Sequence, residues 1–394
     1  MYSKENSLFK MMKSRTLFTA NLAHMLHDGF TDMLYIFFPI WQIQFSLSYM
    51  EVGLFKALSS GIMALFQIPA SWLAGKIGKV HLLIFGTLLT SSAICFWGWA
   101  DSSLLLGCFL ILGGLGSSVQ HPLSSTLISN ACADSEARRM ALSYFNMAGD
   151  FGKLLLPTMA ALIIRFSNWE FSSLSMGMFG FLMAGVLFLL SREYQSETVQ
   201  TVGDLQKSRA SFVWNRKYSS FWALVFIGII DSGTRMGFLT FFPFLLKAHD
   251  ADVTITALAL SLVFAGGAFG KLACGFLSTH WGSKKTVLFT EIATSCLILG
   301  IMVMPLSLEI VLSFFLGIVL NGTSSVIYGT VPDLVSKTDC QQAFAIFYTA
   351  TIASGALSPW IYGTISDTLG IQQTIKIIAI CVWMIVPVVL VYRL

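Results

Sequence analysis

Long apolar stretches separated by short polar connections dominate the hydrophobic pattern of this chain. A helix needs about 20 largely apolar residues to cross the hydrocarbon core of a bilayer. The pattern therefore predicts an all-α membrane protein with twelve transmembrane helices. The predicted spans are 17–44, 50–75, 81–100, 103–129, 139–165, 172–191, 219–247, 253–279, 285–303, 306–331, 341–366 and 370–392.

One connection is much longer and more polar than the others. It covers residues 192–218 and contains five Lys or Arg residues. Because it divides the spans six and six, we expect three parts in the chain. These are an N-terminal six-helix bundle (1–191), a cytoplasmic linker (192–218) and a C-terminal six-helix bundle (219–394).

The two predicted bundles repeat several sequence landmarks in the same order, at an offset that begins at 204 residues and drifts slightly. The matched pairs are Phe37-Phe38-Pro39 with Phe241-Phe242-Pro243, Gly78 with Gly282, Ser117-Ser118-Val119 with Ser324-Ser325-Val326, and Phe145 and Pro157 with Phe347 and Pro359. These matches predict a duplicated six-helix unit and two pseudo-symmetric bundles. A parallel repeat of this kind resembles the architecture of the major facilitator superfamily.

The composition supports lipid as the main solvent of the chain. Only 11% of its 394 residues are charged, 55% are hydrophobic, and the mean hydropathy is +0.75, whereas soluble domains carry about 25% charged residues. The net charge of +4 is not concentrated in a basic patch, so we expect no nucleic-acid partner. The seven scattered cysteines form no metal-site spacing, and no hydrolase or phosphate-binding motif occurs. We therefore expect no cofactor, no metal and no enzymatic activity.

Basic residues predict the orientation of the chain, because Lys and Arg concentrate on the cytoplasmic side of membrane proteins. With the N-terminus inside, 17 of the 24 Lys and Arg residues fall on cytoplasmic segments. Three fall outside and four lie within spans. This distribution predicts cytoplasmic termini and, for a bacterial protein, insertion in the inner membrane.

Ionisable side chains inside a membrane are costly and point to function. His24, Asp28 and Asp32 follow one another at intervals of four residues, on one face of the first span. Two carboxylates one turn apart repel each other when both are ionised, so one of them should hold a proton readily. They are candidate proton-coupling residues, together with His121 of the fourth span. The alternatives are permanent ion pairing of the two aspartates and a neutral His121 bonded to a helix carbonyl.

Two further charged pairs lie in the middle of spans. Asp150 and Lys153 could neutralise each other, or Lys153 could pair across helices with a carboxylate of the first span. Arg235 could grip an anionic substrate through its planar guanidinium, or it could pair with Asp231 one turn away. Lys271 and Glu291 lie in the eighth and ninth spans, and the sequence leaves open whether they reach each other.

A closer resemblance is to the fosmidomycin-resistance type of major facilitator protein. It is carried by three stretches of the N-terminal half, NLAHMLHDGFTD (21–32), GGLGSSVQHPLSS (113–125) and FNMAGDFGK (145–153). The superfamily's signature loop after the second span keeps its glycine and basic residues here, but Gly75 and Thr279 replace its aspartate in the two halves. The resemblance implies a proton-coupled exporter of small, often toxic, compounds, in which spans 1, 4, 7 and 10 line a cavity.

These observations predict a secondary transporter, most simply one that exports a small polar or anionic compound in exchange for protons. The alternatives are uptake of a small anionic metabolite by proton symport and, less simply, a passive channel. We expect the protein to act as a monomer whose partners are a small-molecule substrate, protons and the lipid bilayer. The candidate substrate-binding residues are Arg235, Asp231, Lys153, Asp150, His27 and Gln120.

Overall fold

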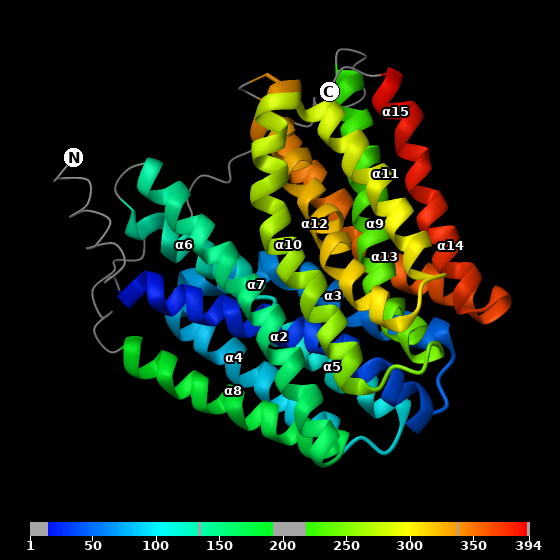
Figure 1. Ribbon diagram of the computed structural model, residues 1–394. Helices are drawn as coiled ribbons and strands as arrows, with labels where there is room; N and C mark the ends of the chain where they lie inside the picture. Colours follow the sequence, from blue (N-terminus) through cyan, green and yellow to red (C-terminus); the bar gives the residue numbers. More distant parts are fainter. Residues whose placement is uncertain (1–14, 133–134, 192–217, 337–338, 392–394) are drawn as a thin grey trace. The chain divides into compact units, whose positions relative to one another are not determined.

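The computed structural model describes residues 15–132, 135–191, 218–336 and 339–391. Within these ranges the chain is built from α-helices and short 3-10 turns, and no strand occurs there (Figure 1). Almost all of the predicted linker, residues 192–217, lies outside the described residues. The six-and-six division at this linker therefore stays a prediction.

Before the linker, the helices are α2 (Arg15–Gln44), α3 (Tyr49–Ile77), α4 (Lys79–Trp97), α5 (Ser103–Ser117), α6 (Gln120–Ala131), α7 (Ser135–Phe166) and α8 (Trp169–Ser191). After it come α9 (Ser219–Ala248), α10 (Val253–Trp281), α11 (Ser283–Ile301), α12 (Leu306–Thr330), η2 (Val331–Leu334), α13 (Cys340–Leu369), α14 (Ile371–Cys381), η3 (Val382–Met384) and α15 (Ile385–Val391).

These elements form twelve membrane-length segments among the described residues, because α5 continues into α6, η2 extends α12, and α14 continues through η3 into α15. Ten of the segments are long and apolar enough to span a membrane by composition alone. The other two, α2 and α11, are less apolar, and both carry ionisable residues near their middle. The prediction of twelve helices is confirmed, and its ends agree with the observed helices to within a few residues.

Two of the predicted spans are interrupted by proline. Span 103–129 was expected to be continuous, but α5 ends at Ser117 and α6 begins at Gln120. Pro122 has no backbone N–H to donate to the carbonyl four residues earlier, and it fits the first turn of the new helix. Pro387 follows the 3-10 turn between α14 and α15 in the same way.

The structure gives matching positions of the repeat the same structural roles. Gly78 and Gly282 each begin a helix with a positive φ, 91° and 82°, which only glycine adopts without strain. Pro39 and Pro243 lie inside α2 and α9, and the two phenylalanines before each of them are fully buried. Recurrence of the same turn and the same buried motif supports the duplicated unit.

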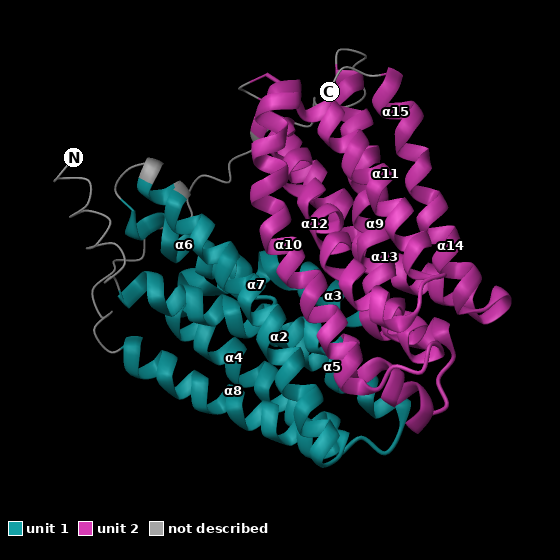
Figure 2. Cartoon of the chain, in the orientation of Figure 1, with its two compact units in different colours: residues 1–34, 58–205 teal, residues 35–57, 206–394 magenta. Residues whose placement is uncertain are grey.

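The described chain separates into two compact units (Figure 2). Unit 1 contains residues 1–34 and 58–205, and unit 2 contains residues 35–57 and 206–394. In unit 1, α2 and α7 approach each other at glycines: a Cβ on Gly152 would overlap the carbonyl of Met25, and one on Gly29 would lie 2.7 Å from the carbonyl oxygen of Gly152. This contact brings Asp28, the neighbour of Gly29, opposite Lys153, the neighbour of Gly152.

Candidate functional site

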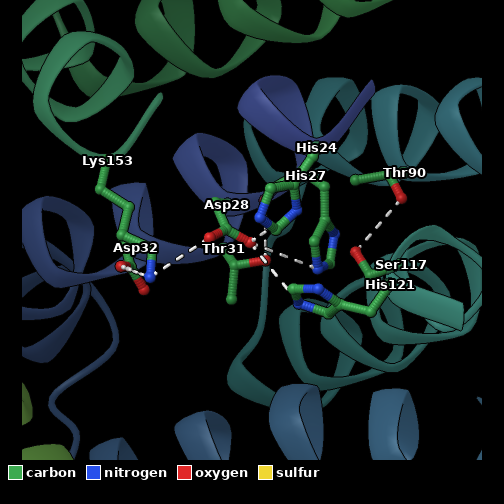
Figure 3. Close-up of polar contacts among 9 residues, drawn as sticks. All are labelled: His24, His27, Asp28, Thr31, Asp32, Thr90, Ser117, His121 and Lys153. Carbon is green, nitrogen blue, oxygen red and sulfur yellow. Dashed lines mark hydrogen bonds and ion pairs between the residues drawn. The ribbon is translucent and has the colours of Figure 1, made fainter. Parts of the chain in front are cut away.

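One buried face of α2 carries the three ionisable residues that their spacing placed together. His24, Asp28 and Asp32 are 3%, 8% and 7% exposed, so all three are inside unit 1. Charged groups in such a place need partners, because removing an ion from water costs several kcal/mol. The partners come from α2 itself, α6 and α7 (Figure 3).

Three histidine rings surround one oxygen of the Asp28 carboxylate (Figure 3). The distances from Asp28 Oδ1 are 3.6 Å to Nδ1 of His24, 3.9 Å to Nε2 of His27 and 3.5 Å to Nε2 of His121. Each is longer than an ordinary N–H···O hydrogen bond, so the rings are close enough to interact with the charge but not tightly bonded to it. The structure thus brings His121, from α6, to the predicted proton-coupling face of α2.

Lys153 reaches the other side of the same carboxylate from α7. Its Nζ lies 3.2 Å from Asp28 Oδ2 and 3.9 Å from Asp32 Oδ2. Of the pairings considered for Lys153, the structure contains the cross-helix one, and Asp150 adds a third negative charge that acts on the ammonium. One lysine therefore lies within reach of two carboxylates of α2, nearer to Asp28.

Phe145 and Gly149 of α7 pack against His24 and leave room for it beside the Asp28 carboxylate. The ring of Phe145 stacks on His24 with centroids 3.8 Å apart and planes at 14°. A Cβ on Gly149 would lie 2.5 Å from Nε2 of His24 and 2.7 Å from Oδ2 of Asp28. Both residues belong to a stretch that carries the sequence resemblance, and their physical role is to seat the histidine against the carboxylate.

The side chains around Asp28 are more exposed than Asp28 itself. The side chain of His121 is 39% exposed and that of Lys153 is 27% exposed, whereas the side chain of Asp28 is only 10% exposed. Gln120 is buried, and its amide donates to Thr87 Oγ1 at 2.9 Å on α4. This hydrogen bond of Gln120 joins α6 to α4. A role of Gln120 in substrate binding stays a prediction.

His24, Asp28 and His121 offer three potential metal-ligand atoms that lie within 4.8 Å of one another. The ammonium of Lys153, 3.2 Å from the same carboxylate, opposes a second cation there. The geometry therefore favours ion pairing over metal binding at this group, and we assign no metal to it.

A second buried charged group lies in unit 2. Asp231 and Arg235 are one turn apart on α9, and Glu291 lies in the middle of α11. Asp231 is 6% exposed and Glu291 is 2% exposed. Sequence analysis identified the pair on α9 and Glu291 as a further charge inside a span.

The fold and the buried charges define the chain as a polytopic helical membrane protein of the transporter class. Comparison with known proteins gives the family. The Major Facilitator Superfamily model matches residues 20–232 and 224–394, so the chain belongs to this superfamily of transporters. The relatives and structural neighbours that match this chain are transporters and not enzymes. The predictions of the superfamily and of its twelve-helix fold are confirmed.

Individual relatives agree with this assignment. The chain is 31% identical over 158 residues to the fosmidomycin resistance protein of Escherichia coli, a match that spans 39% of this chain and only 38% of that protein. It is 22% identical over 358 residues, 84% of this chain and 82% of the relative, to a protein of Cupriavidus necator described as "Probable sulfoacetate transporter SauU". A solved bacterial homologue of the human lysosomal transporter Spinster, inward-facing and occupied, shares the fold with a TM-score of 0.76 at 16% identity, over 95% of both chains.

Proposed function

We propose that this chain is a proton-coupled exporter that exchanges protons for a small polar or anionic compound by alternating access. The observation that supports this proposal is the position of Asp28. It is a buried carboxylate within 3.2–3.9 Å of one lysine and three histidine nitrogens. Its protonation would change every one of these interactions at once.

Proton binding at Asp28 removes the charge that holds Lys153. The ammonium then has Asp32 as its remaining carboxylate partner, at 3.9 Å instead of 3.2 Å. Lys153 would thus move from one aspartate to the other as the proton arrives. Because the two aspartates lie on α2 and the lysine on α7, this exchange of partners biases the packing of two helices, which is how a proton can favour one conformation over another.

The histidines offer a route for the proton. The ring of His121 is partly exposed and lies 3.5 Å from the carboxylate, and the ring of His24 contacts it edge-on with centroids 4.9 Å apart. Imidazole exchanges protons near neutral pH, so we assign His121 the transfer of protons between the exposed side and Asp28. His24 is buried against Phe145 and helps to hold the carboxylate in place.

Antiport requires that substrate and proton exclude each other. A compound that donates N–H or O–H groups to Asp28 or Asp32 would meet this requirement. Such a compound binds the ionised carboxylates, and a proton on the same carboxylate would weaken its binding. We assign contacts with such a compound to Lys153, Asp150, His27 and Gln120 in unit 1, and contacts with an anionic group to Arg235 and Asp231 in unit 2.

One observation favours a second candidate, proton symport of a small anion. Lys153 is 27% exposed, and protonation of Asp28 would leave it only its more distant carboxylate partner, Asp32. An anion could then bind the ammonium, so proton and anion would bind together and travel in the same direction. The two candidates use the same residues and differ in the sign of the coupling.

The chain is an integral membrane transporter, and its relatives named above are bacterial. We propose that it lies in the cytoplasmic membrane with both termini inside, as the excess of Lys and Arg on those segments favours. We also propose that one chain is the transporting unit.

Proteoliposomes that contain a pH-sensitive dye test the proposal and its sign. Candidate compounds are added outside without a pH gradient, and the panel includes fosmidomycin and sulfoacetate because relatives are named for them. An antiporter makes the lumen more alkaline as the compound enters, and a symporter makes it more acidic. Saturable entry of a compound with no movement of protons would contradict proton coupling, and entry that does not saturate would identify a channel.

A further inference from the structure

The start of α3 is held on the end of α13 by one carboxylate. Asp367, in the last turn of α13, accepts hydrogen bonds from the backbone N–H groups of Tyr49 at 2.7 Å and Met50 at 2.9 Å, one on each oxygen. Tyr49 and Met50 are the first two residues of α3. Residues 35–57 are grouped with residues 206–394 in unit 2, so the contact lies inside one unit (Figure 2).

The first turn of α3 has a cap of its own, so Asp367 is not needed to begin the helix. The N–H of Ser48 donates to Glu51 Oε2 at 2.8 Å, and the N–H of Glu51 donates to Ser48 Oγ at 3.2 Å. This reciprocal pair is a capping box. The N–H groups of Tyr49 and Met50 have no acceptor within a helix that begins there, and Asp367 accepts from both. The carboxylate therefore joins two helices.

The backbones of the two helices touch at two glycines. A Cβ on Gly53 would overlap the carbonyl of Pro359, and a Cβ on Gly363 would overlap the carbonyl of Tyr49. The ring of Tyr49 also contacts the ring of Phe244 on α9, with centroids 5.4 Å apart. Glycine is required at both positions of the contact, because any larger residue would push α3 away from α13.

This contact can break and form again without leaving buried polar groups unpaired. Asp367 is exposed at the end of its helix. When the helices part, water can solvate the carboxylate and the two N–H groups at the start of α3. Glycine has no side chain that must be withdrawn from the neighbouring helix, and small residues let membrane helices approach closely. These are the properties of a contact that opens reversibly.

The internal repeat indicates that this contact is specific to α3 and α13. At the offsets of the repeat, the second copy of the helix pair lacks all three residues that make the contact. The matched residues are Gly53 with Ala257, Gly363 with Ala161, and Asp367 with Arg165. Arginine has no acceptor for a backbone N–H. The repeated fold therefore does not itself require the acid or the glycines.

We propose that Asp367 is a latch that keeps the transporter closed on the side opposite to its termini. α3 begins after the first membrane crossing and α13 ends after the eleventh, so both ends lie on that side. α3 belongs to the predicted N-terminal half and α13 to the C-terminal half. When the halves part on that side, Tyr49 and Met50 must leave Asp367. The latch rests on the alternating access of the proposed function, and it does not depend on proton coupling.

Electron-spin distance measurements on the full-length chain in lipid nanodiscs test the latch. Spin labels are placed at Ile43→Cys, near the end of α2, and at Leu369→Cys, at the end of α13, which are both exposed positions. The four cysteines that are not buried are replaced by serine. We expect mainly a short distance in the wild-type background. Asp367→Ala should raise the ratio of a longer distance to the short one by at least about tenfold, because it removes two hydrogen bonds to a charged group.

The matched control is Glu51→Gln, which removes the other acid at the start of α3. Glutamine keeps the capping box, so the ratio of distances should stay as in wild type. Gly53→Ala should favour the longer distance with Asp367 intact, because its Cβ would overlap the carbonyl of Pro359. Gly61→Ala, on the same helix, places its Cβ in open space and should leave the ratio unchanged.

The outcomes separate the latch from the proposed function. An unchanged ratio in folded Asp367→Ala, or an equal shift in Glu51→Gln, would overturn the latch and leave the proposed function standing. A single distance shared by wild type, Asp367→Ala and Gly53→Ala would contradict alternating access, and the latch and the proposed function would both be wrong. The expected shift without proton movement in proteoliposomes would support the latch and contradict proton coupling alone.

Discussion

Replacing Lys153 by methionine tests the ion pair that organises the site of unit 1. Methionine keeps most of the length and packing of the lysine side chain and removes its charge. At a separation of 3.2 Å, two unit charges in an effective dielectric of about 20 attract each other by about 5 kcal/mol. Loss of one partner of a buried pair typically costs about 3–5 kcal/mol.

The coupling energy between Lys153 and Asp28 should be smaller than this, because the Lys153 side chain is 27% exposed and water screens part of the attraction. We therefore expect a coupling energy of about 2–3 kcal/mol between Lys153→Met and Asp28→Asn in a double-mutant cycle. Lys153→Met alone should lower the stability of the chain in detergent, and adding Asp28→Asn should restore part of it, because the uncompensated carboxylate is then gone.

Thermal or denaturant unfolding in detergent, followed by tryptophan fluorescence, measures the four members of the cycle. The matched control is Lys247→Met, which removes a lysine whose Nζ donates to the carbonyl of Pro39 in unit 2. Combined with Asp28→Asn, it should be additive to within about 0.5 kcal/mol. A coupling energy below about 0.5 kcal/mol for Lys153 and Asp28 would show that the pair contributes no net attraction, and the proposed exchange of partners would lose its basis.

Three further predictions concern the helices that position the sites. Gly149→Ala should lower the unfolding temperature and weaken proton coupling because its Cβ would lie 2.5 Å from His24 Nε2, whereas Gly185→Ala, with no atom within 4 Å, should do neither. Gly282→Ala should destabilise the chain by about 1–3 kcal/mol in denaturant unfolding, because φ is 82° and ψ is 154° there, and an unchanged midpoint would contradict this. Asp252→Ala should cost about 1 kcal/mol of stability through loss of the helix cap, and Asp252→Asn should cost almost nothing in the same assay.

Most of the fold follows from the sequence because the bilayer imposes one simple requirement. Each crossing needs a long apolar segment, and such segments can be found without knowing their partners. The interruption at Ser118 and Val119 was missed, because Ser103–Ala131 as a whole is long and apolar enough to span a membrane and only Pro122 marks the lost hydrogen bond. Proline alone does not predict such a break, because Pro39 and Pro243 lie inside continuous helices.

The candidate site could be predicted in part. Helical periodicity was enough to place His24, Asp28 and Asp32 on one face, since their spacing lies within a single helix. The approach of Lys153 depends on contact between α2 and α7, which the sequence does not specify, so its partner stayed open between two choices.

A partner for Glu291 was beyond sequence reasoning for the same reason. The available signal was thermodynamic: an acid near the middle of a span needs a partner. That argument predicts a contact for Glu291 without saying which residue provides it.

Transport-coupled proton movement in proteoliposomes, compared between wild type, Asp28→Asn and Asp32→Asn, tests the central claim most directly. With a compound that moves protons in wild type, we predict that Asp28→Asn still exchanges the compound across the membrane but no longer moves protons with it. Asp32→Asn should retain coupling with altered affinity, because Lys153 keeps its nearer partner. Normal proton movement in folded Asp28→Asn would contradict the assignment of this carboxylate as the proton-coupling site.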